Sequence, residues 1–114
     1  MTSYDFFIPT KVHFGAGRAG ELGSIVGSAA SGRRAALMCS ANEWMAPIVR
    51  VLARSLNDAG IEVTARISGL KPNPTESECL AALETYREGG ADVLVVAGGG
   101  SYLDAGKWLA RESG

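Results

Sequence analysis

The chain combines short apolar runs with longer stretches in which apolar residues recur at helical spacing. The runs at 34–39 and 92–97 are almost continuously apolar, which is typical of strands buried on both faces of a sheet. Residues 61–67 alternate apolar with mostly polar residues and include β-branched ones, as expected of a strand near a sheet edge. Aromatic and β-branched residues at 6–8 and 11–14 predict an extended segment ahead of these three.

Helices are predicted between these segments. The clearest covers 43–59, because its apolar residues share one helical face and Gly60 follows where a left-handed cap is expected. A helix at about 19–30 precedes the first apolar run. Another begins at Thr75, which forms a capping box with Glu78, and a fourth helix follows the last apolar run.

The alternation of strands and helices, four times along the chain, predicts the fold class. Parallel strands need long crossovers, which helices supply, so we expect an α/β domain with a doubly wound, mainly parallel, Rossmann-like sheet. Residues 1–114 contain no linker or internal boundary and are predicted to form one domain. Such sheets bind their ligands at the carboxyl ends of the strands.

Composition and charge exclude several function classes. The 11 Lys and Arg residues against 12 Asp and Glu leave a net charge of −1, which argues against a nucleic-acid partner. The longest apolar stretch, 93–97, is far shorter than the roughly 20 residues that span a bilayer, so no membrane partner and a cytoplasmic location are expected. Cys39 and Cys79 have no metal-binding spacing, and His13 is the only histidine.

Two glycine motifs compete as the phosphate-binding loop. The residues from Gly15 to Gly20 match GxGxxG, but the acidic residue expected about 20 positions later is replaced by Ser40 and Asn42. We therefore favour a tight turn that leads into a helix as the role of this first motif.

The second motif, Gly98-Gly99-Gly100-Ser101, follows the most apolar run and opens a helix. Residues without a Cβ let a pyrophosphate approach the backbone, and the positive end of the helix attracts its charge. Ser101 can cap that helix and donate its hydroxyl to a phosphate oxygen. Asp104 in the first turn and Lys107 one turn later form an ordinary surface pair, unless a ligand in the glycine turn engages Asp104.

Three features together carry a resemblance to a known family. They are the opening Phe14-Gly15-x-Gly17, the loop Pro72-Asn73-Pro74-Thr75, and the run from Gly89 to Lys107 that contains GGGSxxDAxK. In this combination the whole chain resembles the iron-containing (group III) alcohol dehydrogenases. The resemblance implies an amino-terminal domain that binds NAD or NADP, here residues 1–114 of a larger dehydrogenase. It also implies an all-helical domain, absent from this chain, that holds a divalent metal, Fe or Zn, so that the present residues alone would be inactive.

The resemblance also implies roles for particular residues. Gly99, Gly100 and Ser101 would face the pyrophosphate of the cofactor. Asp104 would lie at the nicotinamide-side ribose or amide, and Asn73 at the adenosine portion.

At two positions the chain departs from the family pattern. Ser40 stands where the family commonly has an aspartate that accepts from the adenine-ribose hydroxyls. A serine can donate to a 2′-phosphate that a carboxylate would repel, so NADP is favoured slightly over NAD. Tyr102 stands where the family often has proline, and the sequence suggests no consequence.

The resemblance leaves substrate and assembly open. The expected substrate is a small alcohol or aldehyde, but glycerol dehydrogenases, maleylacetate reductases and dehydroquinate synthases share the glycine-rich turn. A non-catalytic nucleotide-binding module and a flavodoxin-like domain that holds another phosphate are the alternatives outside that chemistry. A homo-oligomer, such as a dimer, is expected, because bare apolar faces drive association and the amino-terminal strand could pair across a two-fold axis.

Overall fold

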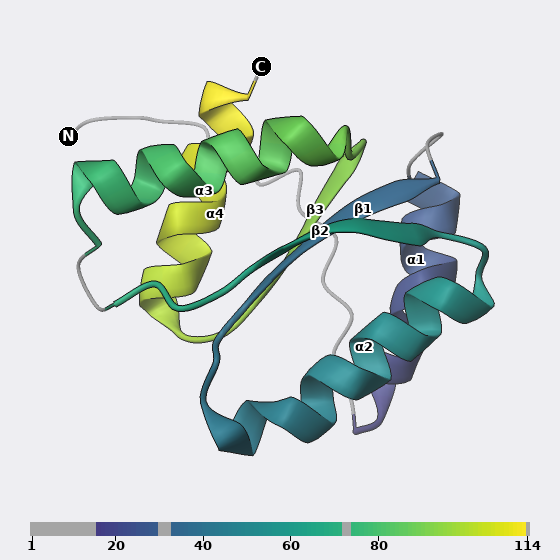
Figure 1. Cartoon of the computed structure of the whole chain (residues 1–114). Helices are drawn as coiled ribbons and strands as arrows, with labels where there is room; N and C mark the ends of the chain where they lie inside the picture. The colour runs from purple at the N-terminus through teal and green to yellow at the C-terminus, as the bar shows by residue number, and fades with distance from the viewer. Residues whose placement is uncertain (1–15, 30–32, 72–73, 114) are drawn as a thin grey trace, which may run out of the picture.

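The computed structural model describes residues 16–29, 33–71 and 74–113. In this part, three parallel strands form one sheet in the order β2-β1-β3 (Figure 1). They are β1 (Arg34–Cys39), β2 (Glu62–Ile67) and β3 (Val93–Ala97), and all three were predicted from the sequence. The extended segment predicted within 6–14 lies outside the described residues.

Helices cover both faces of the sheet (Figure 1). Helices α1 (Leu22–Ala29) and α2 (Ala46–Asp58) pack on one face, and α3 (Glu76–Gly89) and α4 (Gly100–Glu112) pack on the other. β2 and β3 lie on opposite sides of β1, so the crossovers β1-α2-β2 and β2-α3-β3 run in opposite directions. Because parallel crossovers keep one hand, they place their helices on opposite faces. This is the predicted doubly wound arrangement.

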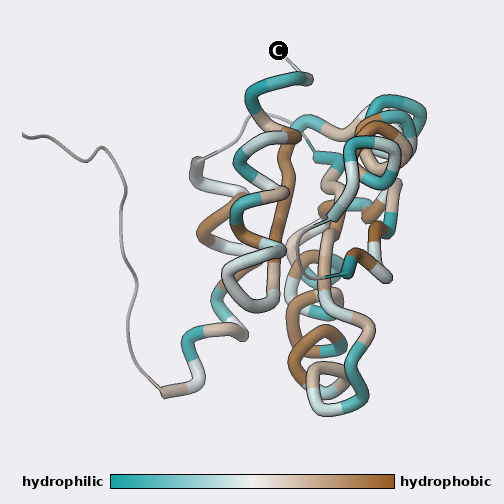
Figure 2. Tube along the Cα trace, turned by 90° about the vertical axis from the view of Figure 1, so that its left-hand side faces the viewer, coloured by the Kyte–Doolittle hydropathy of each residue, from teal (hydrophilic) through white to brown (hydrophobic). Residues whose placement is uncertain are grey.

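The central strand β1 supplies the core of both layers. Its side chains alternate, so Leu37 and Cys39 join the cluster under α1 and α2 while Met38 joins the cluster under α3 and α4. Residues 35–39 are all buried, which explains why this strand is continuously apolar in sequence. Figure 2 shows apolar residues recurring among polar ones along the helices, as expected of helices with one buried face.

The pairing of β1 with β2 contains an irregularity of register. Ala35 pairs with Val63, but Ala36 pairs with Ala65, so Thr64 is an extra residue on β2. This is a β-bulge, which inserts one residue into one strand of a pair.

The bulge changes which side chains of β2 face α2. A Cβ on Gly89 of α3 would meet the Ala65 methyl at 2.9 Å and the Thr64 Oγ1 at 3.2 Å, so both residues lie against α3. The alternation of faces expected for this strand therefore does not hold beyond Thr64, because one inserted residue moves every later side chain to the other face. As a result, Arg66 pairs with Leu37 on the α2 face.

The carboxyl ends of α2 and α3 and the start of α3 follow the predicted signals. Gly60 (φ +76°) and Gly90 (φ +63°) are left-handed just after α2 and α3. Thr75 Oγ1 accepts a hydrogen bond from Glu78 N at 3.2 Å, which is one half of the predicted capping box. The Glu78 Oε2 atom is buried and has no hydrogen-bond partner among the described residues.

Candidate functional site

The strand order reverses between β1 and β3, so the chain leaves the carboxyl ends of these two neighbouring strands in opposite directions. Such a place is called a topological switch point. β2 follows β1 on one side and β3 returns to the other, so the loops after β1 and β3 lead to opposite faces. Ser40 N donates to Ala97 O at 3.2 Å, which holds the two strand ends together at the point of divergence. In open α/β sheets, the crevice outside such a switch point is the place where ligands bind.

A cavity of about 470 Å³ opens at this switch point. Its wall is formed by the loops that follow all three strands and by the first turn of α4. The lining residues are Ser40, Ala41, Asn42, Trp44, Gly69, Leu70, Gly99, Gly100, Ser101 and Tyr102. This volume lies within the range of small-molecule sites, roughly 300–1,000 Å³. The structure thus brings together four of the six predicted cofactor-binding residues.

The glycine turn after β3 exposes backbone to this cavity. A Cβ on Gly99 or Gly100 would meet no atom within 4 Å, so the space over both residues is open. Gly98 differs from these two, because its own backbone and packing require a glycine. Its φ is +158°, and a Cβ there would lie 3.0 Å from the Tyr102 side chain. The first N–H groups of a helix have no partner within it, so the start of α4 presents donors and positive charge to the cavity.

Helix α4 begins at Gly100, earlier than a cap at Ser101 would place it. Gly99 occupies the N-cap position, with no side-chain cap, and Ser101 is the second helical residue. The prediction of Ser101 as N-cap is therefore wrong, since the glycine backbone makes the turn without a capping side chain. The Ser101 side chain is exposed at the cavity and has no hydrogen-bond partner in the described ranges.

The early start of α4 also moves Asp104. It lies in the second turn, not the predicted first, and it does not line the cavity described above. Asp104 and Lys107 are both exposed, and no ion pair joins them within the part of the chain that is described. The contact of Asp104 with a cofactor stays a prediction, and Asn73 lies outside the described residues.

Ser40 closes a small turn directly after β1. It is half-buried, and its Oγ accepts a hydrogen bond from Asn42 N at 3.3 Å. The accepting oxygen keeps its own hydrogen, so the hydroxyl can still donate to a ligand in the cavity. This is the donor that a phosphate would require.

Tyr102 is a wall residue to which sequence reasoning assigned no consequence. It is 8% exposed, and its phenol oxygen accepts a hydrogen bond from Leu70 N at 3.0 Å. The bond ties the loop after β2 to the first turn of α4, and both segments line the cavity. The available signal was its helical spacing from Ala105 and Leu109, which predicts a buried face.

A second cavity, of about 380 Å³, adjoins the first. The two share Ser40, Ala41 and Asn42, and the second extends between β2 and α2. Its lining residues are Cys39, Ser40, Ala41, Asn42, Glu43, Ala46, Val49, Arg50, Arg66, Ile67 and Ser68. Burial raises the pKa of the Cys39 thiol, and the positive charge of Arg66 lowers that pKa by a smaller amount.

Of the first glycine motif, the described residues 16–20 line neither of these two cavities. Gly17 is left-handed (φ +77°) and caps a short 3₁₀ helix, Arg18–Glu21, that leads into α1. This geometry agrees with a tight turn rather than a dinucleotide fingerprint. Within residues 16–29, 33–71 and 74–113, no group of three or more His, Cys, Asp or Glu side chains could hold a metal ion. In the same ranges no helix is long and apolar enough to cross a membrane.

Comparison with known proteins identifies the family. The chain matches the iron-containing alcohol dehydrogenase family over residues 9–114. The chain therefore belongs to this family, as its motifs suggested.

Individual relatives agree with this assignment. The chain is 28% identical over 110 residues to NADH-dependent butanol dehydrogenase A of Clostridium acetobutylicum, covering 96% of this chain and 28% of that protein. It is 36% identical over 50 residues to NADP-dependent alcohol dehydrogenase 3 of Entamoeba histolytica, covering 44% of this chain and 13% of that protein. The crystal structure of NADH-dependent butanol dehydrogenase A from Thermotoga maritima has a TM-score of 0.85 at 30% identity, covering 96% of this chain and 27% of that one. The chain thus spans less than a third of the length of these proteins, and the predicted fold class is confirmed.

Proposed function

We propose that this chain is the part of a metal-dependent alcohol dehydrogenase that binds its nicotinamide dinucleotide, NAD or NADP. One observation carries the proposal: the glycine turn and the start of α4 open into a cavity at the switch point between β1 and β3. The family supports the same function. The proposed substrate of the whole enzyme is a small alcohol or aldehyde.

The chain's own residues bind and orient the cofactor. The pyrophosphate lies against Gly99 and Gly100, where no side chain blocks the backbone, and the Ser101 hydroxyl donates to one of its oxygens. The adenosine end extends toward Ser40 and Asn73, and the nicotinamide end toward Asp104. When bound, the nicotinamide supplies hydride transfer to or from the substrate carbon. The divalent metal would be held by residues other than those described, in the helical domain that the resemblance implies.

Further parts of the proposal concern cofactor form, assembly and location. We propose that NADP binds at least as well as NAD, because Ser40 can donate to a 2′-phosphate. The assembly is proposed to be a homo-oligomer. We place the protein in the cytoplasm, without nucleic-acid or membrane partners, on sequence grounds alone.

The test of dinucleotide binding uses the tryptophan at the cavity. Trp44 lines the cavity and is 67% exposed, whereas Trp108 is half-buried and does not line it. We expect NADH or NADPH to quench Trp44 fluorescence saturably. Inorganic phosphate or flavin mononucleotide should not do so. Quenching by flavin mononucleotide but by neither dinucleotide would instead support a flavodoxin-like domain.

A glycine variant locates the binding site. In Gly100→Ala, the added methyl meets no protein atom but lies between the backbone donors and a pyrophosphate. We expect affinity for both dinucleotides to fall about tenfold or more, which corresponds to about 1.4 kcal/mol, with no loss of stability. Gly20→Ala is the matched control, because Gly20 is also exposed, helical and open around its Cβ. Equal affinities of the two variants would contradict the proposed site.

A further inference from the structure

The second cavity lies where the adenosine end of the proposed cofactor would extend. It shares Ser40, Ala41 and Asn42 with the cavity at the switch point, so one ligand can occupy both. The hydroxyl of Ser40 stands at the junction. A group attached to the adenosine ribose would therefore lie in the second cavity.

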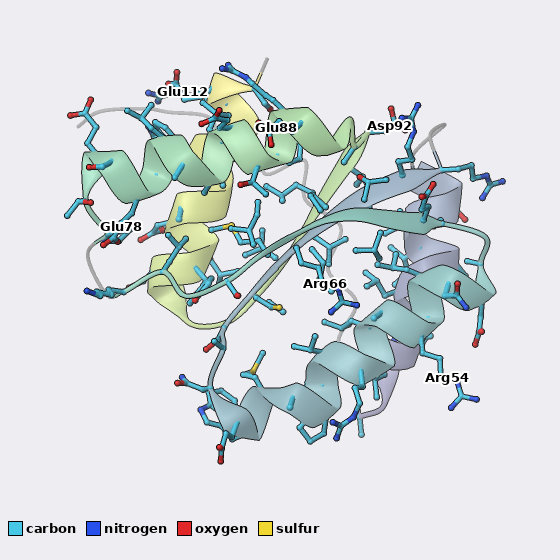
Figure 3. All side chains as sticks on the ribbon, in the orientation of Figure 1. Arg54, Arg66, Glu78, Glu88, Asp92 and Glu112 are labelled. Atoms are coloured by element: carbon cyan, nitrogen blue, oxygen red, sulfur yellow. The ribbon has the colours of Figure 1, made fainter. Side chains whose placement is uncertain are left out.

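Arg66 reaches this cavity only because of the bulge in β2. In a regular ladder, with Thr64 paired to Ala36, Arg66 would pair with Met38 and share the face of α3 and α4. With the bulge it pairs with Leu37 and lies in the space between β2 and α2, as Figure 3 shows. Bulges commonly re-aim a side chain toward a functional site.

Arg50 lines the same cavity from the opposite side, on α2. Both arginines are exposed, and neither has a hydrogen bond or ion pair to a described residue. Among the described residues of the lining, Glu43 is the one carboxylate, so the two guanidinium groups outweigh its charge. Ser40 and Ser68 add hydroxyl donors. These charges and donors suit an anion.

We propose that Arg50 and Arg66 form a subsite for a phosphate monoester on the adenosine ribose, which is the 2′-phosphate of NADP. The inference rests on the proposed function, since it needs the adenosine end at Ser40. Guanidinium groups bind phosphate oxygens through paired, charge-assisted hydrogen bonds, which a neutral ribose hydroxyl cannot match. Ser40 and the two arginines would thus act on the same group.

Two pairs of probes isolate this phosphate. Adenosine 2′,5′-bisphosphate differs from 5′-AMP, and NADPH from NADH, by the 2′-phosphate alone. In the parent protein we expect the phosphorylated member of each pair to bind more tightly. Arg66→Gln and, separately, Arg50→Gln should weaken binding of that member about tenfold, the factor expected for one charge-assisted contact. Binding of 5′-AMP and NADH should change less than about twofold.

Arg54→Gln is the matched control. Arg54 lies on α2 one turn beyond Arg50, does not line the cavity, and points away from the sheet (Figure 3). Arg54→Gln removes the same charge from the same helix as Arg50→Gln, so any general electrostatic effect on binding appears in this control variant as well. Circular dichroism and thermal unfolding of each variant establish that it is folded.

The outcomes separate the two proposals. If NADH binds and NADPH binds no better, or if Arg66→Gln and Arg54→Gln have the same effect, the subsite is overturned while the dinucleotide site stands. If neither dinucleotide binds, both proposals fail. A selective loss for the 2′-phosphorylated probes in both cavity variants supports the subsite.

Discussion

At the scale of single residues, Ser40 and Tyr102 stand out among the side chains that line the cavity at the strand ends. Ser40 lines both cavities, so its side chain would contact a ligand that extends from one cavity into the other. Tyr102 holds the loop after β2, which lines the first cavity. Ser40 could be identified from the sequence because it directly follows a predicted strand. The role of Tyr102 could not, since its partner Leu70 is 32 residues away.

The charge at position 40 should set the cofactor preference. In Ser40→Asp, the new carboxylate repels a 2′-phosphate and can accept hydrogen bonds from the two ribose hydroxyls. We expect NADPH affinity to fall about tenfold or more relative to NADH, which equals about 1.4 kcal/mol or more. The measurement is the pair of dissociation constants. Ser77→Asp, at an exposed position in the first turn of α3, should leave the ratio unchanged. A parent protein with a clear NADH preference would contradict this account.

Removing the Tyr102 hydroxyl should loosen the cavity wall. Tyr102→Phe keeps the buried ring but leaves Leu70 N without its acceptor, so we expect a loss of about 1 kcal/mol of unfolding free energy. Denaturant unfolding measures this loss, and hydrogen exchange at Leu70 should become faster. Tyr86→Phe is the control, because Tyr86 packs on the same cluster and has no hydrogen bond to the described residues. Identical unfolding curves for the two variants would argue against the tether.

At the scale of elements, helices α1 and α2 approach unusually closely at a glycine. Gly23 N donates to Ser55 Oγ at 2.8 Å, and the same Oγ donates to Gly20 O at 2.8 Å. A Cβ on Gly23 would clash with the Ser55 carbonyl oxygen and lie 2.8 Å from the Ala59 methyl. The glycine is therefore required by packing between helices, not by a turn.

Replacing two glycines of α1 by alanine should change the free energy of unfolding in opposite directions. Gly23→Ala must push α2 away, and we expect a loss of about 1–3 kcal/mol of unfolding free energy. Gly27→Ala meets only the Arg33 side chain at 3.7 Å, so its higher helix propensity should stabilise the fold by up to about 1 kcal/mol. Chemical denaturation of both variants is the measurement. A stable Gly23→Ala protein would show that the two helices are not packed as described.

At the scale of the whole molecule, several large apolar side chains remain exposed. On one face of the α2 segment these are Trp44, Ile48 and Val51, and Leu80 and Leu103 are exposed on α3 and α4. Exposed apolar groups that cluster in this way favour association. We expect light scattering to give a mass that is a multiple of 11.8 kDa at high concentration. A monomer at all concentrations would be evidence against a homo-oligomer.

The sequence by itself determined the elements, the parallel α/β class and the glycine turn, because each depends on residues only a few positions apart. Apolar runs mark β1 and β3, Thr75 and Gly90 mark the ends of α3, and the turn at Gly98–Ser101 is one continuous segment.

Only the tertiary structure decided the bulge that brings Arg66 to α2, the tether of Tyr102 to Leu70, and the close contact at Gly23. Each of these depends on partners from another element. The hydrogen bonds at Leu70 and Gly23 each join residues 32 positions apart. No local pattern contains such pairs, because packing of complete elements brings them together.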